Sequence, residues 1–403
     1  MQSNPSADYS QALKGQKIAV IGAGIGGACA ALALARRGAQ VVIYEQAITL
    51  GEVGAGLQIS PNGVAVLAAL GVKPAAKLLA STPEFAELRD PNAGLVARLP
   101  LGATAEQRYG EPYWQFHRAD LLTCLSDAAY AAGVTFKLGH RAEGAADGTL
   151  HCGSEATKFS AIIAADGVHS AHRVAQFGGA SPQFLNHIAW RALVPTDGLP
   201  ADALAAAARV YMGRGRHLVT YPLRGGALMN LVGVVEWNEW VGDSWSQASD
   251  GVAFGAAFQN FGGTVPALLE RVSNCYRWGL FGHAPLARWV NGKLALLGDA
   301  CHPTLPFLAQ GATQALEDGW ALAACLANSS HDISVGLNSY QSARKARADA
   351  VVRAAARSGR LYHVKPPVVQ GIRNIGLRGV AALAPSQMLR RFDWIYGEKP
   401  FGL

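Results

Sequence analysis

Short apolar runs alternate with longer alanine-rich stretches near the start of the chain. Lys17–Ile21 and Gln40–Glu45 are predicted to be buried strands, because each is almost continuously apolar. The segment between them, from about Gly26 to Arg37, is predicted to be a helix that ends at Gly38. A strand, a helix and a second strand in this order indicate a βαβ unit, with both strands parallel in one sheet.

The same alternation of short apolar runs and longer helical stretches recurs further along the chain. Phe159–Ala165 and Lys293–Leu297 are predicted to be further buried strands of this parallel type. Helices are expected near Gly63–Leu70, at Arg118–Ala132 and at Gln310–Leu326. Strands and helices that alternate in this way are typical of an α/β fold.

The middle of the chain has a different pattern. From about Phe184 to Trp289, aromatic and β-branched residues alternate with polar ones, as in His217-Leu218-Val219-Thr220-Tyr221. Turn signals such as Arg224-Gly225-Gly226 separate these segments. A period of two residues is typical of strands with one buried face, so we expect an antiparallel sheet inserted into the first domain.

Composition and charge narrow the possible partners. Half of the residues are hydrophobic and 16% are charged, which favours a large buried core. The formal net charge is +7, and residues 341–403 hold twelve Lys and Arg against three Asp and Glu. This basic region is helical in pattern and forms no groove lined with aromatics, so we expect no nucleic-acid binding. Attraction of an anionic substrate, of NAD(P)H or of membrane headgroups stays open.

Three features bear on compartment and metals. Ile18–Ala35 is an uncharged run nearly long enough to cross a bilayer, but its glycines cluster in a turn, so we expect no stable membrane insertion. The start, Met1-Gln2-Ser3-Asn4-Pro5, shows no secretory signal, and we expect a cytoplasmic location. The six cysteines are scattered, which predicts neither a disulfide framework nor a metal site.

The glycine-rich turn after the first strand predicts a dinucleotide site. Gly22 permits the tight turn, Gly24 lets a pyrophosphate approach the backbone, and Gly27 allows close packing of helix and strand. Glu45 ends the second strand, where a carboxylate accepts hydrogen bonds from a ribose, and we assign Gln46 beside it to the same site. The alternative is that these glycines serve only a tight turn. FAD and NAD both fit this unit.

A later motif favours a flavin. Gly298 and Asp299 follow a buried strand, and a strand-end aspartate can accept a hydrogen bond from a ribityl hydroxyl. The amides of Gly311 and Ala312, at a helix start, are placed to stabilise negative charge on a reduced flavin. The alternative is an aspartate that caps a helix, followed by proline as a turn signal.

Two further residues join this set with weaker support. Asp166, in Ala165-Asp166-Gly167, lies at the end of another predicted strand and could instead belong to a simple Asp-Gly turn. Arg118 begins a predicted helix and could instead form a surface ion pair.

Taken together, the motifs resemble the group A flavoprotein monooxygenases, which are single-component, FAD-dependent aromatic hydroxylases. The resemblance runs from about residue 16 to the end of the chain. It is carried by GAGIGG with Glu45, HRAD with Arg118, ADGVHS with Arg173, and LGDACHP followed by AQGA and Glu317-Asp318. Within this family, the chain is more similar to the branch that contains salicylate hydroxylase, 3-hydroxybenzoate 6-hydroxylase and 6-hydroxynicotinate 3-monooxygenase. The motifs that carry this closer similarity are GAGLQI (54–59), Pro61-Asn62, Trp190-Arg191-Ala192, HLVTYPLRGG (217–226) and DWIYG (393–397).

The resemblance implies a chemistry. NADH or NADPH reduces FAD, the reduced flavin reacts with O2 to a C4a-hydroperoxide, and one oxygen is transferred to an electron-rich ring. It implies a small phenolic or hydroxylated aromatic acid as substrate. Alternatives are a ubiquinone-pathway or other lipid-substrate flavin hydroxylase and a flavoprotein that does not hydroxylate.

The resemblance also suggests the substrate residues. His217 and Tyr221 are four residues apart on an alternating strand and project from one face, so they are our catalytic candidates. Both could instead be ordinary core residues. Gln58 is expected near the flavin, where the hydroxynicotinate enzyme carries a histidine, and this difference argues against 6-hydroxynicotinate as substrate. The expected substrate contacts are Trp190, Arg191 and His302.

The expected architecture is a Rossmann-like FAD-binding domain with an inserted antiparallel β-sheet substrate domain and a C-terminal helical region. The boundaries we expect are 16–75, 105–183 and 290–340 for the FAD-binding domain, 76–104 and 184–289 for the substrate domain, and 341–403 for the helical region. We expect a monomer or a homodimer.

Overall fold

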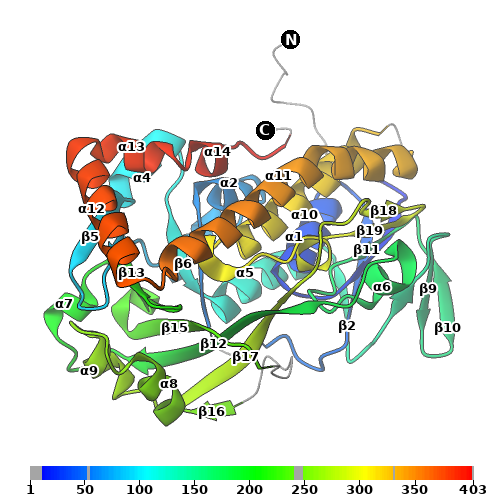
Figure 1. The fold of residues 1–403 in the computed structure, drawn as a ribbon. Coiled ribbons are helices and arrows are strands. Elements are labelled where there is room, and N and C mark those ends of the chain that lie inside the picture. The colour runs from blue at the N-terminus through cyan, green and yellow to red at the C-terminus, as the bar shows by residue number, and fades with distance from the viewer. Residues whose placement is uncertain (1–10, 52–54, 240–247, 330–331, 402–403) are drawn as a thin grey trace.

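The computed structural model describes residues 11–51, 55–239, 248–329 and 332–401 (Figure 1). Residues 1–10, on which the expectation about a secretory signal rests, and Gly54 of the GAGLQI motif lie outside these ranges. Within them, two large sheets lie beside each other, with helices packed around the first sheet and long C-terminal helices across one side of the molecule.

The first sheet has six strands in the order β18-β19-β11-β1-β2-β7. All neighbouring pairs are parallel except β18 with β19, and β11 lies between β1 and β19. The bounds are β1 Lys17–Ile21, β2 Gln40–Glu45, β7 Thr135–Leu138, β11 Ala161–Ala164, β18 Val290–Asn291 and β19 Leu294–Leu296.

The helices that cover this sheet are apolar on most sides because protein surrounds them. Helix α1 (Ile25–Ala35) contacts both α10 (Gly311–Ala327) and α5 (Arg118–Ala131), and nine of its residues are buried. This environment explains the uncharged run of Ile18–Ala35, which belongs to β1, the glycine turn and α1 rather than to a membrane span. No helix among the described residues is long and apolar enough to cross a membrane.

The second sheet has eight strands in the order β16-β17-β12-β15-β14-β13-β4-β5. Its neighbours are antiparallel except β13 with β4. Strands β4 and β5 precede the middle segment 184–289 in the sequence and extend the edge of this sheet. The bounds are β4 Phe85–Arg89, β5 Leu95–Pro100, β12 Gln183–Pro195, β13 Ala207–Gly213, β14 Arg216–Leu223, β15 Leu228–Glu236, β16 Ala248–Asp250 and β17 Asn274–Gly282.

Smaller elements connect and flank the two sheets. The minor sheets comprise β3 (Gly56–Ile59) with β6 (Trp114–His117), and β8 (Glu143–Gly144), β9 (Thr149–Cys152) and β10 (Glu155–Lys158). The other α-helices are α2 Pro61–Ala69, α3 Lys73–Leu79, α4 Gly102–Tyr109, α6 Ala171–Phe177, α7 Ala201–Leu204, α8 Gly251–Phe258, α9 Val265–Leu269, α11 Ile333–Tyr362, α12 Pro367–Leu383, α13 Pro385–Arg390 and α14 Asp393–Tyr396.

The structure confirms the predicted fold class, a mixed α/β architecture with a helical C-terminus. Strands β1 and β2 begin and end at the predicted residues. The later strands are shorter than predicted, since only Ala161–Ala164 and Leu294–Leu296 pair regularly with neighbours. Buried apolar residues therefore continue beyond the ends of these strands.

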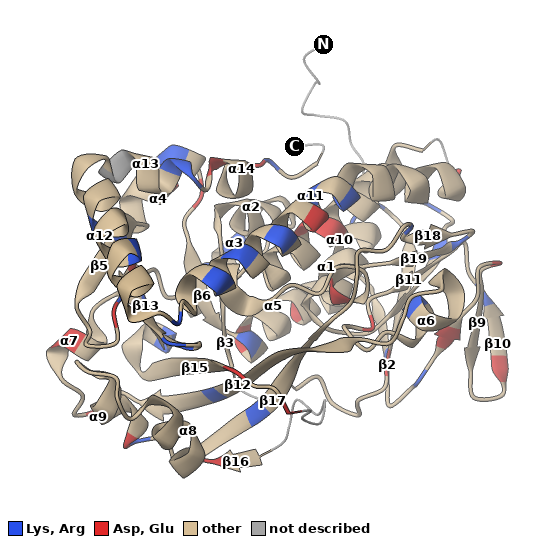
Figure 2. Ribbon diagram, in the orientation of Figure 1, with Lys and Arg blue, Asp and Glu red and all other residues tan. Residues whose placement is uncertain are grey.

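Some of the basic residues of the C-terminal region form ion pairs in the protein interior. Helix α11 carries several Lys and Arg along its length (Figure 2). Arg344 is 4% exposed and binds Glu317, donates from Nε to Asp318 Oδ1 at 2.7 Å and from a terminal nitrogen to Gln314 Oε1 at 2.8 Å. Arg347 binds Glu317 Oε1 at 2.8 Å. These contacts hold α11 against α10.

The same charges keep the acidic residues ionised. Burial alone would raise the pKa of Asp318, but the charges of His302 and Arg344 outweigh it and lower that pKa to about 2. Burial would likewise raise the pKa of Glu317, and Arg344 and Arg347 hold it below its usual value. Both carboxylates thus depend on α11 for their counter-charge.

Replacement of Arg344 by methionine should lower the free energy of unfolding by about 3–5 kcal/mol, because it leaves two buried carboxylates undercompensated. The difference from the parent should shrink as the pH falls from about 4 toward 2, since the low pKa of Asp318 gives a stabilisation that protonation removes. Chemical denaturation at several pH values measures both effects.

The matched control is Lys345→Met on the same helix. Lys345 pairs with Asp349 at 2.8 Å on the partly exposed side, so its loss should cost less than about 1 kcal/mol. Equal effects of the two variants would show that the buried network does not stabilise the fold.

Candidate active site

A cavity of about 630 Å³ lies between the carboxyl ends of β1, β11 and β19 and one face of the eight-stranded sheet. The predicted cofactor residues that line it are Gly22, Gly24, Glu45, Gln46, Gln58, Arg118, Asp166, Gly298, Asp299, Gly311 and Ala312. Arg191, His217 and Tyr221 line it from the sheet. A cavity of this size, with a few polar groups among apolar ones, is typical of a site for small molecules.

The glycine turn is shaped by close backbone contacts on one side and by open space on the other. Gly22 has φ +99°, and a Cβ there would lie 2.4 Å from the carbonyl oxygen of Ala165. A Cβ on Gly27 would lie 2.0 Å from the carbonyl oxygen of Gly22. Gly24 has no atom near its Cβ position and lines the cavity, so the backbone is open there to a bound phosphate.

Glu45 is held by the turn that it faces. Its Oε2 accepts a hydrogen bond from the amide of Ala23 at 2.8 Å, and its Oε1 accepts one from the amide of Ala47 at 2.8 Å. Each carboxylate oxygen keeps a further lone pair, so Glu45 can still accept from a ribose hydroxyl.

Asp166 lines the cavity, and His172 holds one of its carboxylate oxygens. Its Oδ2 accepts from Nδ1 of His172 at 2.7 Å, and Nε2 of His172 accepts from the amide of Gly144 at 2.9 Å, which fixes the tautomer. Burial would raise the pKa of Asp166, but the His172 hydrogen bond and charge hold it below its usual value. Oδ1 of this carboxylate is buried without a hydrogen-bond partner among the described residues.

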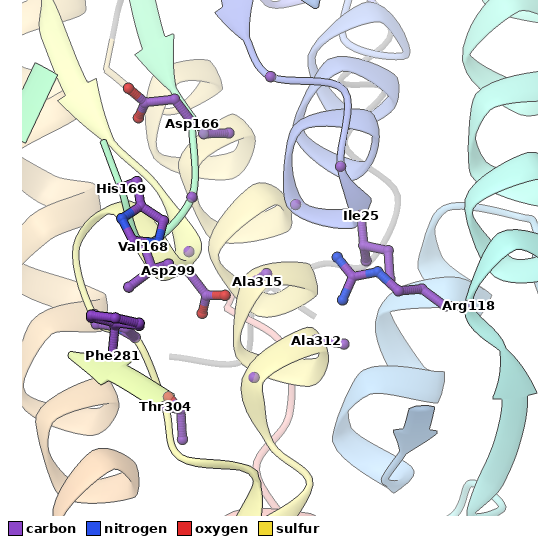
Figure 3. Close-up of a pocket in the computed structure, with 18 of the residues that line it drawn as sticks. Ile25, Arg118, Asp166, Val168, His169, Phe281, Asp299, Thr304, Ala312 and Ala315 are labelled. Carbon is purple, nitrogen blue, oxygen red and sulfur yellow. The ribbon is translucent and has the colours of Figure 1, made fainter. Parts of the chain in front are cut away.

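Arg118 and Asp299 face each other across the cavity. Figure 3 shows the guanidinium of Arg118 and the carboxylate of Asp299 pointing toward the same space, near Ala312 at the start of α10. Burial and the nearby Arg191 lower the pKa of Arg118 to about 10, while Asp299 acts in the opposite direction. Burial raises the pKa of Asp299, partly offset by His302 and Arg118.

The sheet side of the cavity is built from alternating residues of adjacent strands. Arg191 of β12 lies in register with Val232 of β15 and Val219 of β14, and all three line the cavity. The Arg191 guanidinium lies 4.9 Å from the centre of the Trp278 ring. Its Nε is buried without a hydrogen-bond partner, and among the described residues no carboxylate pairs with it. Burial lowers the pKa of Arg191, and the nearby Tyr221 partly offsets this.

His217 is a buried, neutral residue. It is 1% exposed, and Nδ1 lies 2.6 Å from Nε2 of His363, at the end of α11. The rings of Phe307 and Tyr362 pack against it at 5.2 and 5.3 Å. Burial and the neighbouring His363 and His187 lower the pKa of His217 well below its usual value. The Nδ1 contact leaves Nε2 for the cavity.

Tyr221 stays protonated at neutral pH, because burial raises the pKa of its hydroxyl, with Arg191 acting weakly in the opposite direction. The Tyr221 ring packs so closely against Gly56 that a side chain would not fit there: a Cβ on Gly56 would lie 2.7 Å from the Tyr221 hydroxyl oxygen. The protonated phenol of Tyr221 can donate a hydrogen bond at the β3 side of the cavity.

The structure does not bring three of the predicted residues to the cavity. Trp190 lies on the opposite face of β12 and stacks on Phe254, because neighbouring residues of a strand point to opposite faces and Arg191 takes the cavity side. His302 points into the protein and contacts Asp318 Oδ2 at 2.5 Å. Gly27 contributes through packing against Gly22 rather than by lining.

Two polar residues that contact lining residues of the cavity were not predicted from the sequence. Asn230 of β15 is fully buried, and its Oδ1 accepts from the amide of Gly56 at 2.7 Å. The one signal for it is an isolated amide within an otherwise apolar strand. No local motif marks His363, which contacts His217 only because α11 ends beside β14.

The cavity residues fit FAD. Open backbone at Gly24 suits a pyrophosphate, the unpartnered oxygen of Asp166 suits a hydroxyl donor, and the start of α10 suits an anionic ring edge. A Cβ at Gly311 would also meet no atom, so a flat ring can approach the helix start closely.

Known proteins resemble the chain over nearly its whole length. The family model described as FAD binding domain matches residues 16–355. A 3-hydroxybenzoate 6-hydroxylase of Polaromonas naphthalenivorans (strain CJ2) is 35% identical over 394 residues, which cover 94% of this chain and 95% of the relative.

Two solved structures share the fold. A salicylate hydroxylase substrate complex has a TM-score of 0.78 and 27% identity, covering 95% of this chain and 96% of the other. Klebsiella pneumoniae HpxO complexed with FAD and uric acid has a TM-score of 0.82 and 26% identity, covering 96% and 98%. These matches confirm the resemblance inferred from the motifs.

Gly24→Ala should bind FAD roughly tenfold to a hundredfold more weakly, about 1.4–2.8 kcal/mol, because the methyl group occupies the open space at the phosphate position. The apoprotein should unfold at the parent temperature. FAD titration followed by flavin fluorescence measures the first effect and thermal unfolding the second. Gly27→Ala is the matched contrast and should destabilise the apoprotein itself. Unchanged FAD affinity in Gly24→Ala would refute the phosphate position.

Proposed function

We propose that this chain, a member of the FAD-binding-domain family and an FAD-dependent aromatic monooxygenase, hydroxylates a phenolic aromatic acid of the hydroxybenzoate type. NADH or NADPH and O2 are the co-substrates of such enzymes. The proposal also includes a cytoplasmic location and a monomeric or homodimeric state.

The observation that carries the proposal is the set of three polar side chains on one sheet face. Arg191, His217 and Tyr221 line the cavity, opposite the residues that fit FAD. The guanidinium of Arg191 lines the cavity and has no carboxylate partner among the described residues, which makes it the natural partner of a substrate carboxylate. A charged acid bound there would place its ring between the sheet and the flavin side.

Each of these sheet residues then has a separate role toward the substrate. Arg191 orients the acid by its carboxylate. His217, neutral with Nε2 free for the cavity, accepts the proton of the phenolic hydroxyl and so enriches the ring in electrons. Tyr221 donates a hydrogen bond to the substrate. Val219, Val232 and the Trp278 ring keep water from the reacting ring.

FAD, when bound, accepts hydride from NAD(P)H and delivers one oxygen atom of O2 to the ring. What the protein supplies is position, a dry cavity and a proton acceptor.

The decisive assay follows NAD(P)H oxidation by the FAD-loaded enzyme against a panel of hydroxybenzoates, hydroxynicotinates and uncharged phenols. We expect at least one phenolic acid both to stimulate oxidation and to appear as a product heavier by one oxygen in mass spectrometry. The proposal fails if no aromatic acid does both. Activity that appears only with a lipid quinone precursor in detergent would favour the lipid-substrate alternative.

Arg191→Gln should raise KM for the phenolic acid by roughly tenfold to a hundredfold, the cost of about one charge-assisted pair, while kcat and the KM for an uncharged phenol change little. Steady-state kinetics with both substrate types check this. Arg277→Gln is the control: Arg277 lies on the neighbouring strand β17, outside the residues that line the cavity. Equal losses for charged and uncharged substrates would mean that Arg191 does not bind the carboxylate.

A further inference from the structure

His217 is linked to the surface by a row of titratable groups from distant parts of the chain. His217 lies on β14, His363 at the end of α11 and Glu236 at the end of β15. Backbone contacts fix the three together: the amide of Gly215 donates to the carbonyl of His363 at 3.3 Å, and the amide of Glu236 donates to the carbonyl of Gly215 at 2.8 Å.

From the cavity outward, the side chains of this row follow in the order His217, His363, Glu236. Nδ1 of His217 lies 2.6 Å from Nε2 of His363, and Nδ1 of His363 lies 3.4 Å from Oε1 of Glu236. Nδ1 of His363 is buried and makes no hydrogen bond in this geometry, so transfer along the row requires Glu236 to turn Oε1 toward the ring. Lys365 binds the other oxygen of Glu236 at 2.6 Å, which leaves Oε1 for His363.

Exposure rises along the row. His217 and His363 are 1% and 4% exposed, whereas the side chains of Glu236 and Lys365 are 30% and 63% exposed. The rings of Phe307 and Tyr362 pack against His217 without lining the cavity themselves. A proton accepted by His217 from a bound substrate therefore has an outlet through His363 and Glu236.

The charge states suit transfer in this direction. Burial, His187 and Lys365 lower the pKa of His363 to about 4, against the opposing effect of Glu236, so its ring is neutral at neutral pH. Burial would raise the pKa of Glu236, but Lys365 and His363 hold it below its usual value, so it is a carboxylate. The groups that face this pair are His187, His217, Lys365 and the hydroxyl of Tyr362, which bonds to the carbonyl of Phe307.

We propose that His217, His363 and Glu236 form a proton relay that carries the phenolic proton of the substrate from the cavity to solvent. This rests on the proposed function, since it requires a phenolic substrate. The substrate hydroxyl gives its proton to Nε2 of His217, Nδ1–H of His217 passes to Nε2 of His363, and Nδ1–H of His363 passes to Glu236. The reverse transfer returns a proton to the product oxygen and restores both starting tautomers.

His363 could instead merely hold the ring of His217 in place, and one pair of variants separates the two roles. In His363→Gln the amide oxygen can still accept from Nδ1–H of His217, but an amide cannot pass a proton on. His363→Ala loses both functions. The control is His187→Gln: the His187 ring lies 5.4 Å from that of His363, but its Nδ1 contacts the carbonyl of Leu185 at 2.6 Å, outside the row.

The experiment measures proton release when the FAD-loaded enzyme binds the panel's best phenolic acid, by stopped flow with phenol red in weakly buffered solution. We expect His363→Gln and His363→Ala to slow release and kcat together by roughly a hundredfold, and Glu236→Gln by roughly tenfold. His187→Gln should stay within about twofold of the parent, and free imidazole should restore His363→Ala. Release in His363→Gln at the parent rate would overturn the relay and leave His363 a positioning residue.

A measurement without substrate keeps the relay separate from the proposed function. In protein labelled with ¹⁵N-histidine, we expect His217 to carry its proton on Nδ1 and to show a ¹⁵N–¹⁵N coupling to Nε2 of His363 through the hydrogen bond. Absence of this coupling would overturn the relay. Failure of every phenol in the panel, with the coupling present, would overturn the proposed function and leave the shared proton established.

Discussion

Parallel pairing of β11 between β1 and β19 is the constraint on which the cavity depends. Parallel strands present their carboxyl ends at one edge of a sheet, so the loops after these three strands must meet there. The loops carry Gly22, Asp166 and Asp299, which are far apart in the sequence. The loops after β1 and β11 are also in direct contact: Gly22 lies so close to the carbonyl of Ala165 that no side chain would fit between them.

A second constraint is the buried charge network between α10 and α11. The start of α10 faces the cavity, and two of its carboxylates, Glu317 and Asp318, are bound by Arg344 of α11. Glu317 also accepts from Asn62 at 2.6 Å, which ties α2 to the same cluster. Since His363 directly follows the last residue of α11, the network that holds the flavin side of the cavity also places the histidine that contacts His217.

The cavity therefore joins two kinds of structure with different tasks. Loops at the edge of the parallel sheet offer backbone amides and carboxylates that suit a dinucleotide. The antiparallel sheet offers one face of alternating side chains, on which apolar residues surround Arg191, His217 and Tyr221. A rigid sheet keeps these three groups at constant separations, as expected where a ring must be held for attack at one position.

The sequence by itself determined the elements and motifs whose meaning is local. A βαβ unit, its glycines and its strand-end acids follow from backbone sterics within a few residues, so β1 and β2 could be placed to the residue. The spacing of His217 and Tyr221 on a strand likewise determined that they share a face. Only the tertiary structure decided which face of the strand lines the cavity. Arg191 lines it, whereas Trp190 lies on the opposite face and His302 points inward to Asp318. The tertiary structure alone joined His363 to His217, because that contact spans 146 positions and depends on how α11 packs, which no local pattern encodes.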